Sequence, residues 1–152
     1  MARPRLGSTA GERRFLKAQG AADGDWLDYD FAVVRAVPHV HLDTHMNVGV
    51  VVHSRTTGFL RARTLTDPAV LTQRVRGADT ELLSRYLASY EGVARGEESH
   101  GPVALAPPSE RFHWLTSPRS DVIQCSQVHS GRSRDLDGTV DALFEEYVAG
   151  QD

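Results

Sequence analysis

Apolar runs separated by polar turns divide the first half of the chain into strands. The segments 29–37 ("YDFAVVRAV"), 47–54 ("NVGVVVHS") and 59–65 ("FLRARTL") are rich in β-branched and aromatic residues, and each predicts a strand. The intervening "RTTG" ends in Gly58, which favours a tight turn between the second and third strands. This half of the chain therefore predicts a sheet that includes a β-hairpin.

Apolar residues at helical spacing mark the later segments. Residues 79–96 carry an apolar stripe at i, i+3 and i+4 positions, formed by Leu82, Leu83, Tyr86, Leu87, Tyr90 and Val93. Residues 138–150 predict a last helix that begins at Thr139 as N-cap and places four residues on the core side, Val140, Leu143, Phe144 and Tyr147. A short helix is expected over 68–75, with Asp67 as N-cap and Pro68 in the first turn.

A fourth strand is expected over about 121–129, within the stretch "RFHWLTSPRSDVIQCSQVHSG". Ahead of it, only a single turn is expected, at Ser109-Glu110. Ile123 and Cys125 favour one face of this strand as the core face, since side chains alternate along a strand. Strands followed by a helix, a strand and a helix predict an α+β fold, in which a mostly antiparallel sheet of about four strands packs against two main helices.

Composition favours one globular domain. The chain has 152 residues and a formal net charge of −3, so its overall charge does not favour nucleic acid or a membrane surface as partner. Residues 1–25 lack apolar periodicity and are expected to be a flexible arm, while 26–150 are expected to form a single α+β domain. Cys125 is the only cysteine, which excludes a disulfide framework. We expect a cytoplasmic protein.

The polar face of the fourth strand is the first candidate site. Guanidinium, hydroxyl and amide groups that converge on one point suit a phosphate or a carboxylate. The candidate ligand-binding residues are Asn47, Arg111, Arg119, Ser120, Gln124, Ser126 and His129. The alternative is an ordinary solvated strand face, on which glutamine and serine are common.

The segment "HVHLDTH" (39–45) has the residue types of a metal site. His39, His41, Asp43 and His45 would point the same way in an extended chain, and imidazole with carboxylate suits Zn²⁺. The array contains one residue too many for the H-x-H-x-D-H metal motif of metallo-β-lactamase-like hydrolases. We therefore expect loop histidines without a metal, and no cofactor.

Three segments carry a resemblance to a known family. "YDFAVVRAVP", "NVGVVV" and the long stretch 111–131 resemble the bacterial family known as domain of unknown function 3037, over roughly Tyr29 to Val148. The segment "HLDTHM" departs from the family pattern, which places a charged and aromatic stretch there. The matching positions are Asn47, Val48, Gly49, Arg111, Phe112, Trp114, Leu115, Pro118, Arg119, Ser120, Ile123, Gln124, Ser126, His129 and Gly131.

Two function classes remain open from the sequence. The first is an accessory or binding module that holds an anionic ligand or docks a partner protein. The resemblance suggests a HipA-like kinase as that partner by association only, because some relatives are similar to proteins encoded beside such kinases. The second is a small hydrolase or phosphotransfer enzyme that uses His129 with Arg111 and Arg119.

Overall fold

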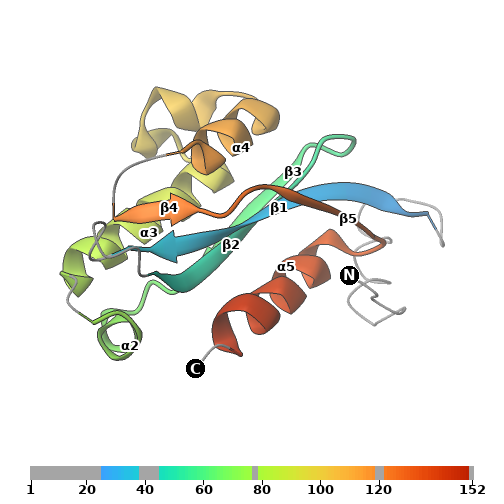
Figure 1. The fold of residues 1–152 in the computed structure, drawn as a ribbon. Coiled ribbons are helices and arrows are strands. Elements are labelled where there is room, and N and C mark those ends of the chain that lie inside the picture. Colours follow the sequence, from blue (N-terminus) through green and yellow to red (C-terminus); the bar gives the residue numbers. More distant parts are fainter. Residues whose placement is uncertain (1–24, 38–44, 77–78, 119–121, 151–152) are drawn as a thin grey trace.

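The computed structural model describes residues 25–37, 45–76, 79–118 and 122–150. They form an antiparallel sheet with helices on both faces (Figure 1), which confirms the expected α+β class. The expected arm, residues 1–25, lies outside the described residues except for Asp25. The strands are β1 (Leu27–Ala36), β2 (Met46–Ser54), β3 (Phe59–Thr64), β4 (Ile123–Cys125) and β5 (His129–Ser133).

The long strand β1 is the centre of the sheet. β2 pairs with one edge of β1, and β3 pairs with the far edge of β2. The other edge of β1 is shared by two short strands, with β4 pairing near its C-terminal end and β5 near its N-terminal end. Every one of these pairings is antiparallel.

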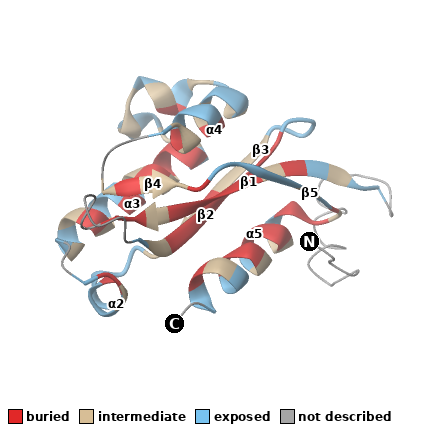
Figure 2. Cartoon of the chain, viewed as in Figure 1, coloured by how far each residue is buried: buried red, intermediate tan, exposed pale blue. Residues whose placement is uncertain are grey.

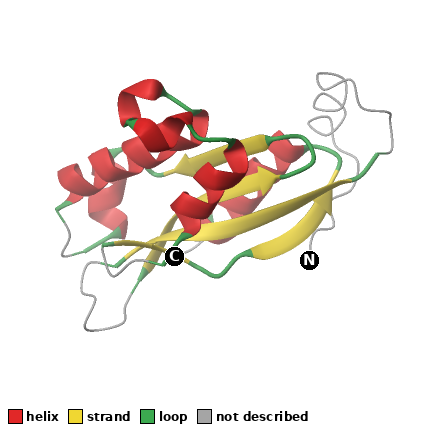
Figure 3. Cartoon of the chain, turned by 90° about the horizontal axis from the view of Figure 1, so that it is seen from above, coloured by secondary structure: helices red, strands yellow, loops and turns green. Residues whose placement is uncertain are grey.

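Helices cover the sheet in two layers, α3 and α4 on one face and α5 on the other (Figures 1 and 3). The last turn of α5 continues as the π-helical segment η4, which widens the end of this helix. The helical elements are α2 (Pro68–Arg74), α3 (Thr80–Arg95), η2 (Glu98–His100), η3 (Pro102–Leu105), α4 (Pro108–Thr116), α5 (Leu136–Phe144) and η4 (Glu145–Ala149).

Burial on both faces explains why the first two strands read as nearly continuous apolar runs (Figure 2). Ala32, Val34 and Ala36 of β1 pack under α3 and α4, whereas Phe31 and Val33 pack under α5. An antiparallel strand exposed on one face would alternate apolar and polar residues, but these strands are covered twice. Among the described residues, no helix is long and apolar enough to cross a membrane.

Carboxylate caps set the helix starts. Asp67 and Asp79 cap α2 and α3 by accepting backbone N–H groups, the first as expected. The expected start of the last helix at Thr139 is wrong, because Asp135 accepts the N–H of Gly138 at 3.0 Å and the helix begins at Leu136. Thr139 is buried, and its hydroxyl donates to Ser133 Oγ at 2.6 Å.

The expected fourth strand is broken in the middle. Ser126 separates β4 from β5, because its backbone N–H donates to the carbonyl of Val33 while its Oγ accepts the N–H of Val33, both at 2.9 Å. A side-chain oxygen thus replaces a backbone carbonyl in the ladder, and regular pairing stops. The expected core face of β4 is confirmed, since Ile123 is buried and Cys125 packs against the same core.

Two other expectations are corrected. The single turn expected at Ser109-Glu110 is instead the start of α4, because Phe112 and Leu115 bury one face of a full helix. Tyr86, expected in the core with Tyr90, is 44% exposed, whereas Tyr90 is buried and donates its hydroxyl to the carbonyl of Leu115 at 2.7 Å. The apolar stripe of α3 is therefore narrower than its spacing predicts.

Candidate functional site

Three polar side chains form a row across the C-terminal end of β1. Arg35 of β1 pairs in register with Asn47 of β2 on one side and with Gln124 of β4 on the other. Because Val33 on the same strand face packs under α5, the row lies on the α5 face. We call these three residues the Arg35 row.

Arg35 is the central group of this row and the only charged member. Its side chain is half-buried, and its Nε is buried without a hydrogen-bond partner among the described residues. Within the same residues, no carboxylate forms a salt bridge with it. A guanidinium with a buried N–H is costly unless an acceptor meets it, so this position favours an anion.

The β-bulge beside Arg35 helps to place the row. The register between β1 and β2 shifts between Val34 and Arg35, so that Val34 faces Gly49 while Arg35 faces Asn47. Val48 is the extra residue and points into the core under α3. A bulge of this kind re-aims the side chains that follow it, and here it brings Asn47 beside the arginine.

Asn47 anchors the end of the last helix to the row. Its Nδ2 donates to the backbone carbonyl of Tyr147 at 2.9 Å, within the π-helical segment η4. The ring of Tyr147 lies 5.8 Å from that of Phe31. Burial raises the pKa of Tyr147, and the charge of Glu146 is a smaller cause in the same direction.

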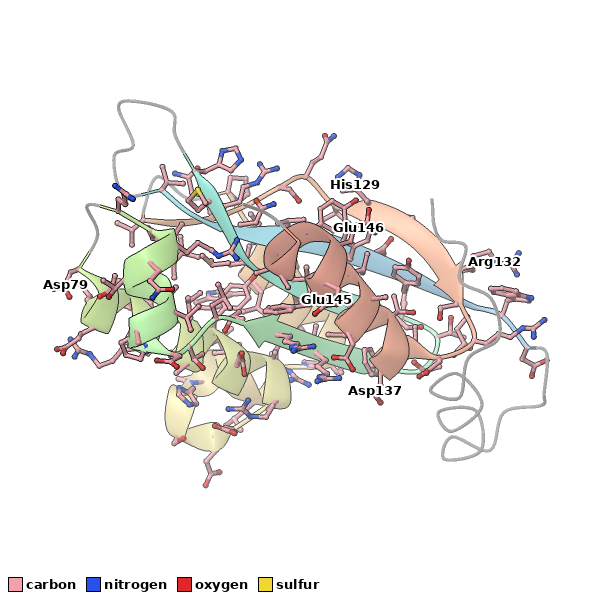
Figure 4. All side chains as sticks on the ribbon, turned by 90° about the horizontal axis from the view of Figure 1, so that it is seen from below. Asp79, His129, Arg132, Asp137, Glu145 and Glu146 are labelled. Atoms are coloured by element: carbon pink, nitrogen blue, oxygen red, sulfur yellow. The ribbon has the colours of Figure 1, made fainter. Side chains whose placement is uncertain are left out.

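His129 lies on the same face of the sheet but further along it. It pairs in register with Phe31, four residues before Arg35, and the two rings are 5.4 Å apart. Seen from below, His129 and Glu146 lie on the side of the sheet that α5 covers (Figure 4). The structure thus brings three of the expected site residues, Asn47, Gln124 and His129, to one face.

Arg111, by contrast, belongs to the opposite face. It lies on α4, where its Nε donates to the carbonyl of Ala106 at 2.8 Å and its Nη1 donates to those of Val93 and Ala94 at 3.1 and 2.7 Å. The two Nη1 bonds satisfy carbonyls at the C-terminal end of α3, a position that favours a cation. Arg111 therefore stabilises the packing of two helices and does not join the row.

Ser126 also has a structural role. It is 8% exposed, and its hydroxyl accepts from Val33 and donates to the carbonyl of Gln127 at 2.9 Å. The expectation that it shares an accessible face with Gln124 is wrong, because the break after β4 turns it inward.

Several expected residues lie outside the described residues. These are Arg119 and Ser120 of the candidate site, together with His39, His41 and Asp43 of the expected histidine loop. His45 is described and exposed at the start of β2. In the described part of the chain, no group of three or more potential metal ligands occurs.

Sequence reasoning missed Arg35, although a signal was present. The run "FAVVRAV" holds one charged residue in an otherwise apolar strand that is buried on both faces. A charge at such a position requires a partner or a function.

A family match covers both the fold and the row. The family described as protein of unknown function (DUF3037) matches residues 31–148. The chain belongs to this family. The DUF3037 match includes all three members of the Arg35 row and confirms the resemblance seen in the sequence. The chain has no significant match among curated proteins or among solved structures.

Proposed function

We propose that the protein is a binding module that holds a phosphate- or carboxylate-bearing ligand at the Arg35 row. The observation that carries this proposal is the buried Nε of Arg35, which has no partner among the described residues. An arginine fork offers parallel N–H donors that match the oxygens of either anion. Charge-assisted hydrogen bonds of this kind are shorter and stronger than neutral ones.

Each neighbour of Arg35 has a distinct part in the proposal. Gln124 contributes an amide that can donate to a second oxygen of the anion. Asn47 keeps the end of α5 beside the row through its bond to Tyr147. Arg119 and Ser120, which precede β4 in the sequence, are proposed as further donors. His129 is proposed as a contact for the part of the ligand that extends along the sheet.

The geometry favours binding over catalysis at this face. An enzyme that used His129 with Arg111 would need both on one side of the sheet, and Arg111 lies on the other side with three donors committed to carbonyls. A partner protein, for which the family resemblance suggests a HipA-like kinase, would be held through an acidic side chain at the same arginine.

The test compares Arg35→Met with Arg61→Ala as a matched control. Arg61 is a half-buried arginine of β3 that pairs with Asp137 at 3.0 Å and is not part of the row. Isothermal titration would use inorganic phosphate, pyrophosphate, nucleoside monophosphates and small dicarboxylates. We expect Arg35→Met to lose roughly 1.5–3 kcal/mol of binding free energy, the scale of a charged hydrogen bond, and the control to lose none.

Stability supplies the second readout. Methionine has a similar length without the charge, so Arg35→Met should leave the melting temperature unchanged or raise it. A large loss of stability would show that Arg35 is a structural ion-pair member, and the proposal would fall. Equal affinity in wild type and Arg35→Met would reject it directly.

A further inference from the structure

A second polar row crosses β1 at its other end and on its other face. Ser130 of β5, Asp30 of β1 and His53 of β2 pair in register. We call these residues the His53 row. A hollow of about 520 Å³ opens beside it, lined by Asp28, Tyr29, Asp30, Arg55, Thr56, Ser130, Gly131 and Arg132. Asp30 and Ser130 belong to both the row and the hollow.

His53 is held in one orientation under α4. It is 5% exposed, and its ring stacks on that of Phe112 with centroids 4.9 Å apart and planes tilted by 25°. Its Nε2 lies 3.4 Å from the hydroxyl oxygen of Ser109. A buried imidazole with a fixed ring and a hydroxyl at its nitrogen has the arrangement of a base and its nucleophile.

Burial of the imidazole favours the neutral form of His53. Burial is the largest cause that lowers the pKa of His53; Asp30 opposes it, and Arg55 and Arg111 add to it. A neutral imidazole can accept the proton of the Ser109 hydroxyl. Asp30 is itself held by Ser130, whose hydroxyl donates to Oδ1 at 2.7 Å.

Ser109 is exposed in the first turn of α4 and is therefore accessible from solvent. The first N–H groups of a helix have no acceptor within it, and here the N-cap is Pro107, which offers no capping side chain. Donors of this kind stabilise an oxygen that gains negative charge, which is the requirement of an acyl-transfer step. The hollow supplies Arg55 and Arg132, of which Arg132 is paired with Asp28 at 3.3 Å.

We propose that Ser109 is a nucleophile and His53 its general base, acting on small esters that carry an anionic group seated against Arg55 in the hollow. Asp30 is a positioning residue that favours the imidazolium formed during the reaction. This activity is independent of binding at the Arg35 row, which lies on the other face.

The proposed reaction balances with water alone as co-reactant. The Oγ of Ser109 attacks the ester carbonyl while its proton passes to Nε2 of His53. The C–O bond to the alcohol breaks, and the alcohol leaves with the proton from His53. Water then attacks the acyl-serine and gives its proton to His53, and Ser109 is released with its own proton restored as the carboxylic acid departs.

The first test is covalent labelling of the full chain with a fluorophosphonate probe, followed by peptide mapping. We expect a single adduct on Ser109, no adduct in Ser109→Ala, and a labelling rate at least about 100-fold lower in His53→Gln. Ser117→Ala is the matched control, since this hydroxyl lies at the other end of α4 and donates to the carbonyl of His113. It should be labelled like wild type.

Mapping also separates Ser109 from another serine–histidine contact. Ser89 Oγ lies 3.2 Å from Nδ1 of His100. An adduct on Ser89, an adduct that persists in Ser109→Ala, or no adduct in wild type would each overturn the proposal. The same variants should show the same order of hydrolysis rates with p-nitrophenyl succinate, whose free carboxylate suits Arg55. Each of these proteins should hydrolyse p-nitrophenyl acetate, which has no such carboxylate, more slowly.

A second variant covers the case in which His53→Gln fails to fold. In Ser109→Cys, alkylation by iodoacetamide reports the thiolate, and a neighbouring imidazole that takes its proton lowers the pKa of the thiol below the ordinary value of about 8.5. The charged groups that act on His53, and therefore affect this pH profile, are Asp30, Arg55 and Arg111. A midpoint at or above the ordinary value would overturn the proposal.

Discussion

The Arg35 row and the His53 row cross the same strand, yet they satisfy their charges in opposite ways. In the Arg35 row the guanidinium meets no carboxylate of the described chain. In the His53 row and its hollow, Asp30 accepts from Ser130 and Asp28 pairs with Arg132. The carboxylates of the second region thus have partners within the described chain, whereas the guanidinium of the first region has none.

The largest expected effect separates packing from polarity within β4. Ile123 is buried in the core under α3, while the neighbouring Gln124 lies in the Arg35 row. Ile123→Ala should destabilise the protein by about 2–5 kcal/mol, since it leaves a cavity in a packed core. Gln124→Ala should cost less than about 1 kcal/mol in the same chemical denaturation experiment. Equal losses would mean that the row is part of the architecture.

Two glycines allow a comparison between the two polar rows, because Gly49 lies beside the Arg35 row and Gly131 lies in the hollow beside the His53 row. An added Cβ at Gly49, beside the Arg35 row, would lie 2.8 Å from the backbone oxygen of Arg63, and one at Gly131, in the hollow, would lie 2.5 Å from Oη of Tyr29. Backbone yields less readily than a side chain, so Gly49→Ala should cost more, about 1–3 kcal/mol. Chemical denaturation of both variants measures the difference, and the reverse order would contradict this ranking.

The lowered pKa of His53 should make the stability of the protein depend on pH. The unfolded chain takes up a proton on this histidine near its ordinary pKa of 6.5, but the folded protein does so only at lower pH. The stability contribution is therefore fully present above pH 6.5 and is lost as the pH falls through the folded pKa. Between about pH 7.5 and pH 5.5, the melting temperature of the wild type should fall more steeply with decreasing pH than that of His53→Gln. An equal fall in the melting temperatures of the two proteins would contradict a lowered pKa of His53.

The smallest expected effect concerns the arm. A protein that begins at Trp26 should melt within about 2 °C of the full chain, because residues 1–25 show no apolar periodicity. Binding at the Arg35 row and labelling at Ser109 should both be retained. Loss of either one alone would show whether the arm contributes to the Arg35 row or to the pair formed by Ser109 and His53.

The sequence predicted the elements better than the site, and the reason is physical. Periodicity and caps depend on local residues, so β1, β2, β3, α2 and α3 were found close to their observed bounds. The break at Ser126 depends on a bond to Val33, 93 positions away, which no local pattern contains. Register likewise decides that Gln124 meets Arg35 and that Arg111 does not.

The contact between His53 and Ser109 could not be predicted from the local sequence either. Histidine and serine are common residues, and nothing in the segments around His53 and Ser109 links two positions 56 residues apart. The contact arises only because α4 packs across β2. A buried polar residue at the end of an apolar strand was the available signal, as "NVGVVVHS" shows.

The break at Ser126 also means that β4 and β5, which share one edge of β1, can open separately from each other. The amide of Val33 is held by a serine oxygen, so β4 and β5 are two short ladders with a side-chain link between them. Amide hydrogen exchange should therefore protect the two strands as separate units with their own opening rates. Removing the hydroxyl of Ser126 would speed exchange at Val33 first, a local reporter placed midway between the two polar rows.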